Sequence, residues 1–198
     1  MTEFTDVIAA FRQSLGENRN GSLPVAVIKA AIDVFGVHNV FVYSQTSDRY
    51  YVTLRNGVEL MFNQSDLEYC SYRADFTPVR GRDESQNALL MDIYDYARLC
   101  YCVMVKHVLV LGEGNQTRSD WNDAMDVLNS SLDAEALPML LGITNVKGPQ
   151  PWMSSQKESG IIAWNEHRAV FASHGYYDHF GEMRQLGPLF PKRIQLIG

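Results

Sequence analysis

The spacing of apolar residues along the chain changes from a helical period to a strand period. Over most of residues 1–142, apolar side chains recur every three or four positions, whereas residues 143–198 contain short apolar runs separated by turns. Helices followed by a mainly antiparallel sheet are typical of the α+β class. We therefore expect a single domain over residues 1–198, with a helix-rich part (about 1–142) and a sheet-rich part (about 143–198).

The most apolar helical segment covers residues 22–36. The dipeptide Asn20-Gly21 forms a turn before it, and Ser22 is a residue type that often caps a helix N-terminus. Within the segment only Lys29 and Asp33 carry charge. A helix that is apolar on nearly all sides is buried, so we expect this helix at the centre of the protein.

The same two patterns predict the other elements. Helices are expected from Thr2 or Thr5 to about residue 15 and over 67–72, 84–111, 121–128 and 134–141; strands over 40–43, 50–54, 58–62, 160–164, 168–173 and 193–197. Arg55-Asn56-Gly57 joins two of these strands, and Asn-Gly between such runs is a strong hairpin signal. We therefore expect a β-hairpin near residues 40–63. Residues 175–181 are predicted to form a loop or tight hairpin.

Composition narrows the function classes. The 198 residues are 46% hydrophobic and 20% charged, with a net charge of −6, as in an ordinary globular protein. The sequence lacks the runs of Lys and Arg that would indicate a nucleic-acid partner. No apolar run reaches the roughly 20 residues of a membrane span. The acidic stretch 1–6 lacks the basic region of a signal peptide. We expect a cytoplasmic protein that binds neither nucleic acid nor membrane.

Motifs for metals and cofactors are missing from the sequence. Cys70, Cys100 and Cys102 have neither metal-ligand spacing nor the pattern of a disulfide framework, and no HExxH or glycine-rich nucleotide motif occurs. The acidic residues at every third position from Asp120 to Asp126 are typical of a solvated helix face. We therefore expect no metal site and no cofactor.

Ser22 and His167 are the candidates for nucleophilic chemistry. Ser22 would lie at the positive end of the buried helix dipole, where an anion is stabilised; alternatively it is only the helix cap. His167 precedes a strand and would project towards another layer, where Asp178 could orient its ring; alternatively it is an exposed turn histidine.

Two short motifs resemble the papain-like cysteine peptidase superfamily, and in particular its calpain-type group. The matching stretches are residues 20–28, which resemble the nucleophile loop and central helix, and 166–171, which resemble the His-Ala strand. Residues 175–182 resemble the Gly-Tyr-Asp turn that often follows that strand. The resemblance implies a central buried helix packed against an antiparallel sheet, and activity on peptide or amide bonds without a cofactor.

The chain departs from this family where the nucleophile should be. Matching the helix places Ser22 at the cysteine position, whereas matching the Gly-x-Cys pattern places Leu23 there; we prefer Ser22. Three explanations are open: a Cys-to-Ser variant, a natural pseudoenzyme, or a true serine nucleophile. Arg168 also replaces the small residue that usually follows the histidine.

The resemblance assigns the remaining roles. His167 would be the base, with Asp178 or alternatively Gln185 as its orienting residue. Asn18 or Asn20 would serve the oxyanion hole, because Gln13 lies far upstream.

Three functions follow from these alternatives. The first is a papain-like peptidase or amide-bond acyl transferase that lacks its cysteine. The second is a non-catalytic module on the same fold that binds a protein or peptide. The third is an unrelated α+β domain in which Ser22 and His167 never meet.

Overall fold

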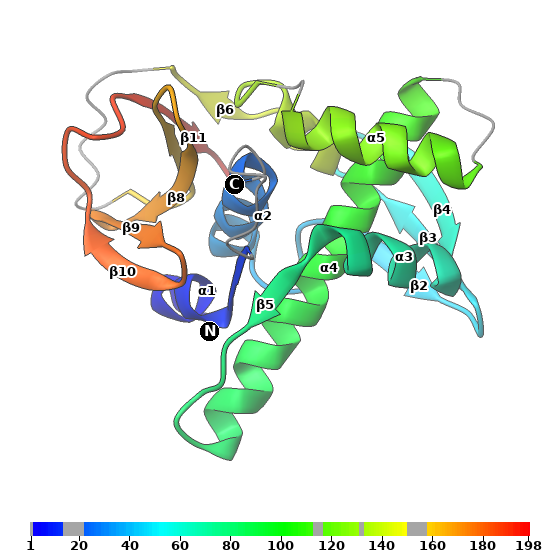
Figure 1. Cartoon of the computed structure of the whole chain (residues 1–198), viewed down its shortest axis with the longest axis horizontal. Helices are drawn as coiled ribbons and strands as arrows, with labels where there is room; N and C mark the ends of the chain where they lie inside the picture. Colours follow the sequence, from blue (N-terminus) through cyan, green and yellow to red (C-terminus); the bar gives the residue numbers. More distant parts are fainter. Residues whose placement is uncertain (1, 14–21, 113–116, 131–132, 150–157) are drawn as a thin grey trace.

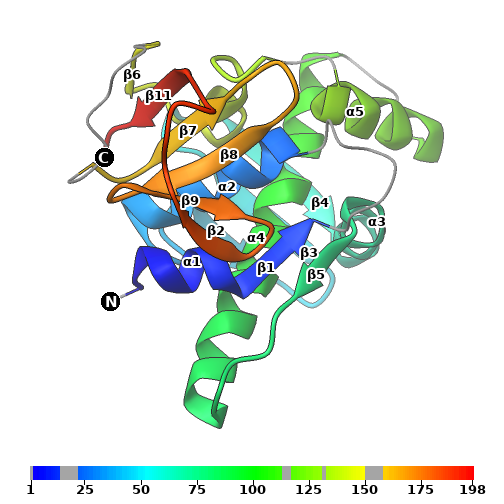
Figure 2. The ribbon, with the colours of Figure 1, turned by 60° about the vertical axis from the view of Figure 1, so that its left-hand side comes forward.

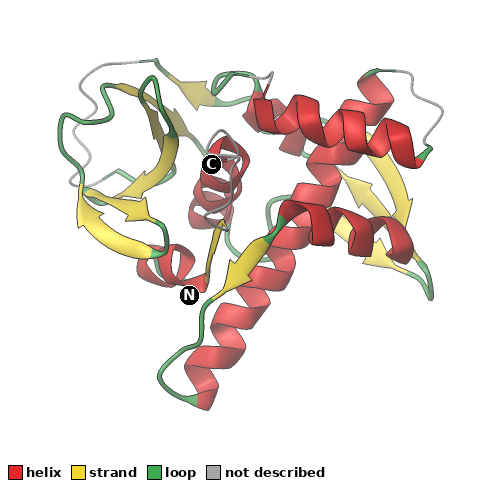
Figure 3. Cartoon of the chain, viewed as in Figure 1, coloured by secondary structure: helices red, strands yellow, loops and turns green. Residues whose placement is uncertain are grey.

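The computed structural model describes residues 2–13, 22–112, 117–130, 133–149 and 158–198, with Ser22 described by its backbone only. The helices are α1 (Phe4–Ala10), α2 (Ser22–Phe35), α3 (Gln64–Ala74), α4 (Glu84–Leu111), α5 (Arg118–Ser130) and the 3-10 helix η2 (Leu137–Leu141). The strands are β1 (Phe11–Gln13), β2 (Val42–Gln45), β3 (Arg49–Thr53), β4 (Glu59–Asn63), β5 (Phe76–Pro78), β6 (Val146–Lys147), β7 (Ile161–Trp164), β8 (Ala169–Ser173), β9 (Tyr176–His179), β10 (Glu182–Gln185) and β11 (Lys192–Leu196). The predicted α+β class is confirmed (Figure 3).

Helix α2 lies between the large sheet and the helical part (Figure 1). Residues 24–32 are all buried, as the apolar pattern predicted. Gly160 lets the sheet approach this helix, because a Cβ atom there would come within 2.2 Å of Val34 Cγ2. Its N–H donates a hydrogen bond to Asp33 Oδ2 at 2.8 Å, so one of the two charges of α2 joins the helix to the sheet.

The large sheet has the strand order β10-β9-β8-β7-β11-β6, and all neighbouring strands are antiparallel. Figure 2 shows β7, β8 and β9 in front of α2. All five residues of β8 are buried, because Ala169 and Phe171 pack in the main core with α2, whereas Val170 packs in a second core on the other face. That second core includes Phe190, from the segment that leads into β11.

The helical part is built around α4, whose observed bounds match the predicted 84–111. Asp83 caps its start by accepting a hydrogen bond from the Gln86 N–H at 2.8 Å. Residues 99–107 are all buried, whereas the first turns project beyond the rest of the molecule (Figure 1). The predicted hairpin is also present: β2, β3 and β4 form an antiparallel sheet, and Gly57 has the positive φ of 87° that the turn requires.

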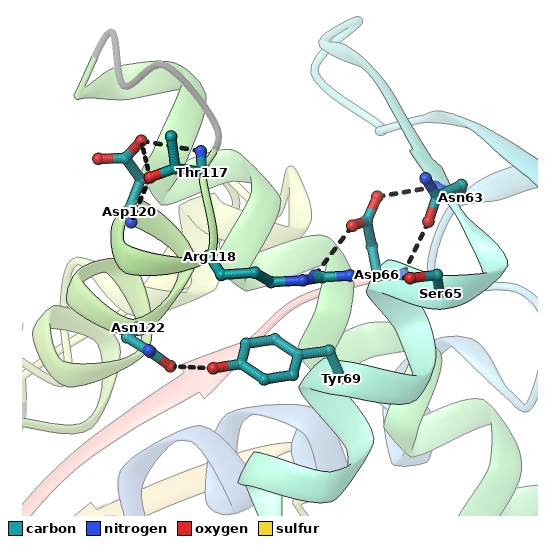
Figure 4. Close-up of polar contacts among 8 residues, drawn as sticks. All are labelled: Asn63, Ser65, Asp66, Tyr69, Thr117, Arg118, Asp120 and Asn122. Atoms are coloured by element: carbon teal, nitrogen blue, oxygen red, sulfur yellow. Dashed lines mark hydrogen bonds and ion pairs between the residues drawn. The ribbon is translucent and has the colours of Figure 1, made fainter.

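Polar side chains join α3 to α5 on the surface of the helical part (Figure 4). Arg118 donates hydrogen bonds to Asp66 Oδ1 at 3.1 Å and to Ser65 Oγ at 2.8 Å. Tyr69 donates to Asn122 Oδ1 at 2.5 Å. These contacts fix the position of α5, whose C-terminal end lies beside the cavity described below.

The structure corrects the predicted elements at three places. The first helix ends at Ala10, because residues 11–13 form β1 and pair with β5; the predicted end near residue 15 lies outside the described residues. Of the two alternatives for residues 175–181, the loop is wrong: residues 176–179 form strand β9, which makes hairpins with β8 on one side and β10 on the other. The predicted helix over 134–141 is reduced to the 3-10 turn η2.

Candidate functional site

A cavity of about 230 Å³ lies between the N-terminal end of α2 and the turn that precedes β8. It is lined by Leu23, Asn129, Ser130, Asp133, Ala134 and residues 164–169. Leu23 follows Ser22 directly, so the start of α2 and His167 border the same cavity. The side chain of Ser22 and both proposed oxyanion residues, Asn18 and Asn20, lie outside the described residues, and their roles stay predictions.

The His167 turn is held by a neighbouring asparagine. Asn165 Oδ1 accepts hydrogen bonds from the N–H groups of His167 at 2.8 Å and Arg168 at 2.9 Å. The Asn165 N–H in turn donates to the Arg168 carbonyl at 3.0 Å. This closed turn fixes the backbone at the entrance of β8 and leaves the His167 side chain exposed on the cavity wall.

Asp178 is engaged away from His167. Its Oδ2 accepts a hydrogen bond from Lys29 Nζ at 2.8 Å, and its Oδ1 accepts one from the Gly181 N–H at 2.8 Å. Only 9% of its side chain is exposed. Both carboxylate oxygens therefore stabilise other groups: one balances the charge of a buried lysine, and the other closes the turn that follows β9.

Lys29 is fully buried in the middle of α2. Besides Asp178, its Nζ donates to the carbonyl oxygens of Ile8 at 2.9 Å and Phe11 at 2.5 Å. An ammonium group has three N–H donors, so these three acceptors satisfy it fully. Burial lowers the pKa of Lys29, and the charge and hydrogen bond of Asp178 oppose that shift. The lysine thus ties α1 and β1 to α2 and β9.

The register of the sheet shows why β9 supplies no partner for His167. Continuing the β8–β9 register from the Ala172–Tyr177 pair would place residue 182 opposite His167. Strand β9 ends at His179, and the chain then turns back into β10. No residue of β9 therefore lies opposite His167.

Gln185, the alternative orienting residue, lies near the other end of β8. It pairs with Tyr176 on β9, and Tyr176 pairs with Ser173, the last residue of β8. His167 precedes the first residue of the same strand. At about 3.3 Å per residue, the two ends of β8 are separated by roughly 13 Å. Gln185 is therefore not placed to orient the His167 ring.

The cysteines are not available as nucleophiles. Cys70 lies in α3, Cys100 and Cys102 lie in α4, and all three are fully buried. Burial raises the pKa of the Cys100 and Cys102 thiols, which disfavours the reactive thiolate. The chain therefore presents no accessible thiol at the cavity or elsewhere.

A smaller cavity, of about 40 Å³, lies further along the same face of α2. It is lined by Arg12, Gln13, Val25, Ala26, Asp178, Phe180 and residues 168–171. From the sequence, Arg12 was passed over and Gln13 was set aside as too far upstream for an oxyanion hole; the structure places both residues at this smaller cavity. Residues 11–13 are held by the pairing of β1 with β5. The available signal was Lys29, because a lysine in an apolar helix needs acceptors, and one of them is the Phe11 carbonyl of β1.

Within the described residues, no group of three or more His, Cys, Asp or Glu side chains is arranged to hold a metal ion. In the same part of the chain, no helix combines the length and the apolar character needed to cross a membrane. The chain gave no match to family models, to curated proteins or to solved structures.

Proposed function

We propose that this chain has a papain-like arrangement and binds a peptide at the cavity beside His167 without cleaving it. The arrangement is supported by the order of the parts: a helix start, a helical middle, and then a histidine at the entrance of a strand that packs against that helix. The observation that carries the proposal is that Leu23 and His167 line one cavity while Asp178 is paired with Lys29.

The absence of cleavage follows from the groups around the cavity. A serine hydroxyl is a weak nucleophile and needs a base that takes its proton. That base works best when a third group holds the imidazole in the correct orientation. The carboxylate expected to do so is engaged by Lys29 and Gly181, and the family's cysteine is replaced by serine.

Restoring a thiol tests the proposal. Ser22→Cys is compared with Ser44→Cys, an exposed control on β2, in the rate of labelling by a peptide vinyl sulfone. We expect the two thiols to react at similar rates, and Ser22→Cys to react at the same rate with and without His167→Ala. Labelling of Ser22→Cys that is about a hundredfold faster than the control, and lost with His167→Ala, would contradict the proposal.

That contrary result would support the second candidate function. A papain-like peptidase or amide-bond acyl transferase whose cysteine is replaced by serine would regain its nucleophile in Ser22→Cys. The shared cavity favours this alternative, because it brings the start of α2 and His167 to one place.

Peptide binding is tested separately. A pool of randomised peptides is passed over the immobilised protein, and the retained peptides are identified by mass spectrometry. We expect retention by the parent chain and loss in His167→Trp, whose larger side chain obstructs the cavity. Thr53→Trp, at an exposed position of β3, is the matched control and should retain the same peptides. Equal retention by both variants would show that the cavity is not the binding site.

A further inference from the structure

The two cavities are neighbours at the start of β8. Arg168 and Ala169 line both of them, so the smaller cavity at Arg12 lies next to the larger one at His167. A peptide bound beside His167 would therefore extend towards the smaller cavity. The residues at this second position decide which chemical group it accepts.

The smaller cavity is positively charged in a chain that is negatively charged overall. Arg12 and Arg168 line it, and its one acidic residue, Asp178, is already neutralised by Lys29. The net charge of the whole chain is −6. Two arginines and no unpaired carboxylate among the lining residues favour an anionic group at this cavity.

Arg168 is held in position before any ligand arrives. Its guanidinium lies 4.9 Å from the Phe180 ring centre and 5.3 Å from that of Phe190. One terminal nitrogen, Nη2, lies 3.0 Å from His179 Nδ1 and donates to it when the ring is neutral and carries its proton on Nε2. Burial is the main cause that lowers the pKa of His179, and the charges of Arg184 and Arg168 lower it further. The neutral ring is therefore favoured. An arginine fixed by stacking loses little entropy when it binds a planar anion.

We infer that the smaller cavity receives a carboxylate of the bound peptide, held between Arg12 and Arg168. This inference rests on the proposed peptide-binding function. A cavity needs about 10–15 Å³ on this measure to hold one water molecule, so the volume of about 40 Å³ has room for a carboxylate group. The carboxylate comes either from an Asp or Glu side chain or from the peptide C-terminus, and a guanidinium fork recognises both in the same way.

The test uses two pools of randomised peptides, one with free C-termini and one with amidated C-termini. Enrichment of Asp or Glu at one position in the amidated pool supports the inference and identifies a side-chain carboxylate. Retention confined to the free-acid pool supports it and identifies the C-terminus. For the strongest retained peptide, Arg12→Gln and Arg168→Gln should each weaken binding by about tenfold, because a charge-assisted hydrogen bond is lost. Arg49→Gln, at an exposed position of β3, is the matched control and should bind normally.

The negative outcomes separate this inference from the function on which it rests. Peptides retained without any preference for a carboxylate, or bound equally by parent and arginine variants, overturn the inference and leave peptide binding in place. If neither pool is retained, both the carboxylate inference and the proposed peptide binding are wrong. Thermal unfolding of Arg168→Gln checks that the variant is folded, and Arg12→Gln provides a second substitution at an exposed position that tests the same cavity.

Discussion

The surroundings of Lys29 and the surroundings of His167 differ in how their polar groups are satisfied. Lys29 is fully buried, and its three donors meet three acceptors from α1, β1 and β9. His167 is exposed, and the hydrogen bonds around it hold its backbone rather than its ring. A buried charge must be paired within the protein, whereas an exposed ring on a cavity wall stays available to a ligand. From the sequence, Asp178 was expected beside His167, whereas in the structure it pairs with Lys29.

Removing the buried ammonium group should have the largest effect. Lys29→Met leaves Asp178 and two carbonyl groups without their donor, so we expect a loss of about 3–5 kcal/mol in the free energy of unfolding. Urea denaturation measures it. The double variant Lys29→Met/Asp178→Leu should lose less than the sum of the two single variants, since no carboxylate is left unpaired. A change below about 1 kcal/mol would show that the buried pair does not hold the N-terminal segment in place.

Opening the His167 turn should have a smaller effect. Asn165→Ala removes the acceptor for two backbone N–H groups, which remain near solvent, and we expect a loss of about 1 kcal/mol in the free energy of unfolding. Peptide retention should fall clearly even though the loss of stability is small, because the turn positions His167 on the cavity wall. Unchanged retention with reduced stability would argue against that positioning role.

The other charge of α2 predicts a modest pH dependence. Burial is the main cause that raises the pKa of Asp33 above 3.8, so its ionised form is disfavoured in the folded protein. Below that value the carboxyl is protonated in both states; above it, the unfolded chain ionises first. Parent stability should therefore fall relative to Asp33→Asn as pH rises from 3.8 through the folded pKa, and then level off. Unfolding of both proteins at a series of pH values measures this difference, and a difference that shrinks with pH would contradict it.

Truncating the exposed histidine should change stability least. His167→Ala removes an exposed side chain, so we expect the free energy of unfolding to stay within about 0.5 kcal/mol of the parent. Thermal unfolding and peptide retention are measured together. A large loss of stability would mean that His167 is a structural residue like Lys29, and the contrast between the two regions would disappear.

Local patterns predicted several elements closely. The long helix α4 matched its predicted bounds because its apolar residues repeat at helical spacing and polar residues cap it at Asp83. The hairpin of β3 and β4 followed from Asn56-Gly57 between two alternating runs. The burial of α2 followed from its composition. In each case the signal and the structure lie within the same short stretch of chain.

Strand pairing explains the two segments that depart from the local prediction. Strand β9 lies between Gly175 and Gly181, which are typical of turns, and it becomes a strand because β8 and β10 supply hydrogen bonds on both sides. Residues 11–13 leave the helical pattern because β5 pairs with them and Lys29 binds the Phe11 carbonyl. The pairing of Phe11 with Pro78 joins segments far apart in the sequence, so no neighbouring residue indicates it, whereas the partners of β9 are the strands directly before and after it.

By itself, the sequence determined the α+β class, the central buried helix and the presence of a histidine at the entrance of a late strand, since each depends on the periodicity or chemistry of a short segment. Only the tertiary structure decided that Asp178 pairs with Lys29, 149 positions away in the chain, and that Leu23 and His167 share a cavity. A buried ammonium group takes whichever carboxylate the packing brings within reach. The partner is therefore set by the register of β9 against β8 and by the position of α2 on the sheet, which no local pattern records.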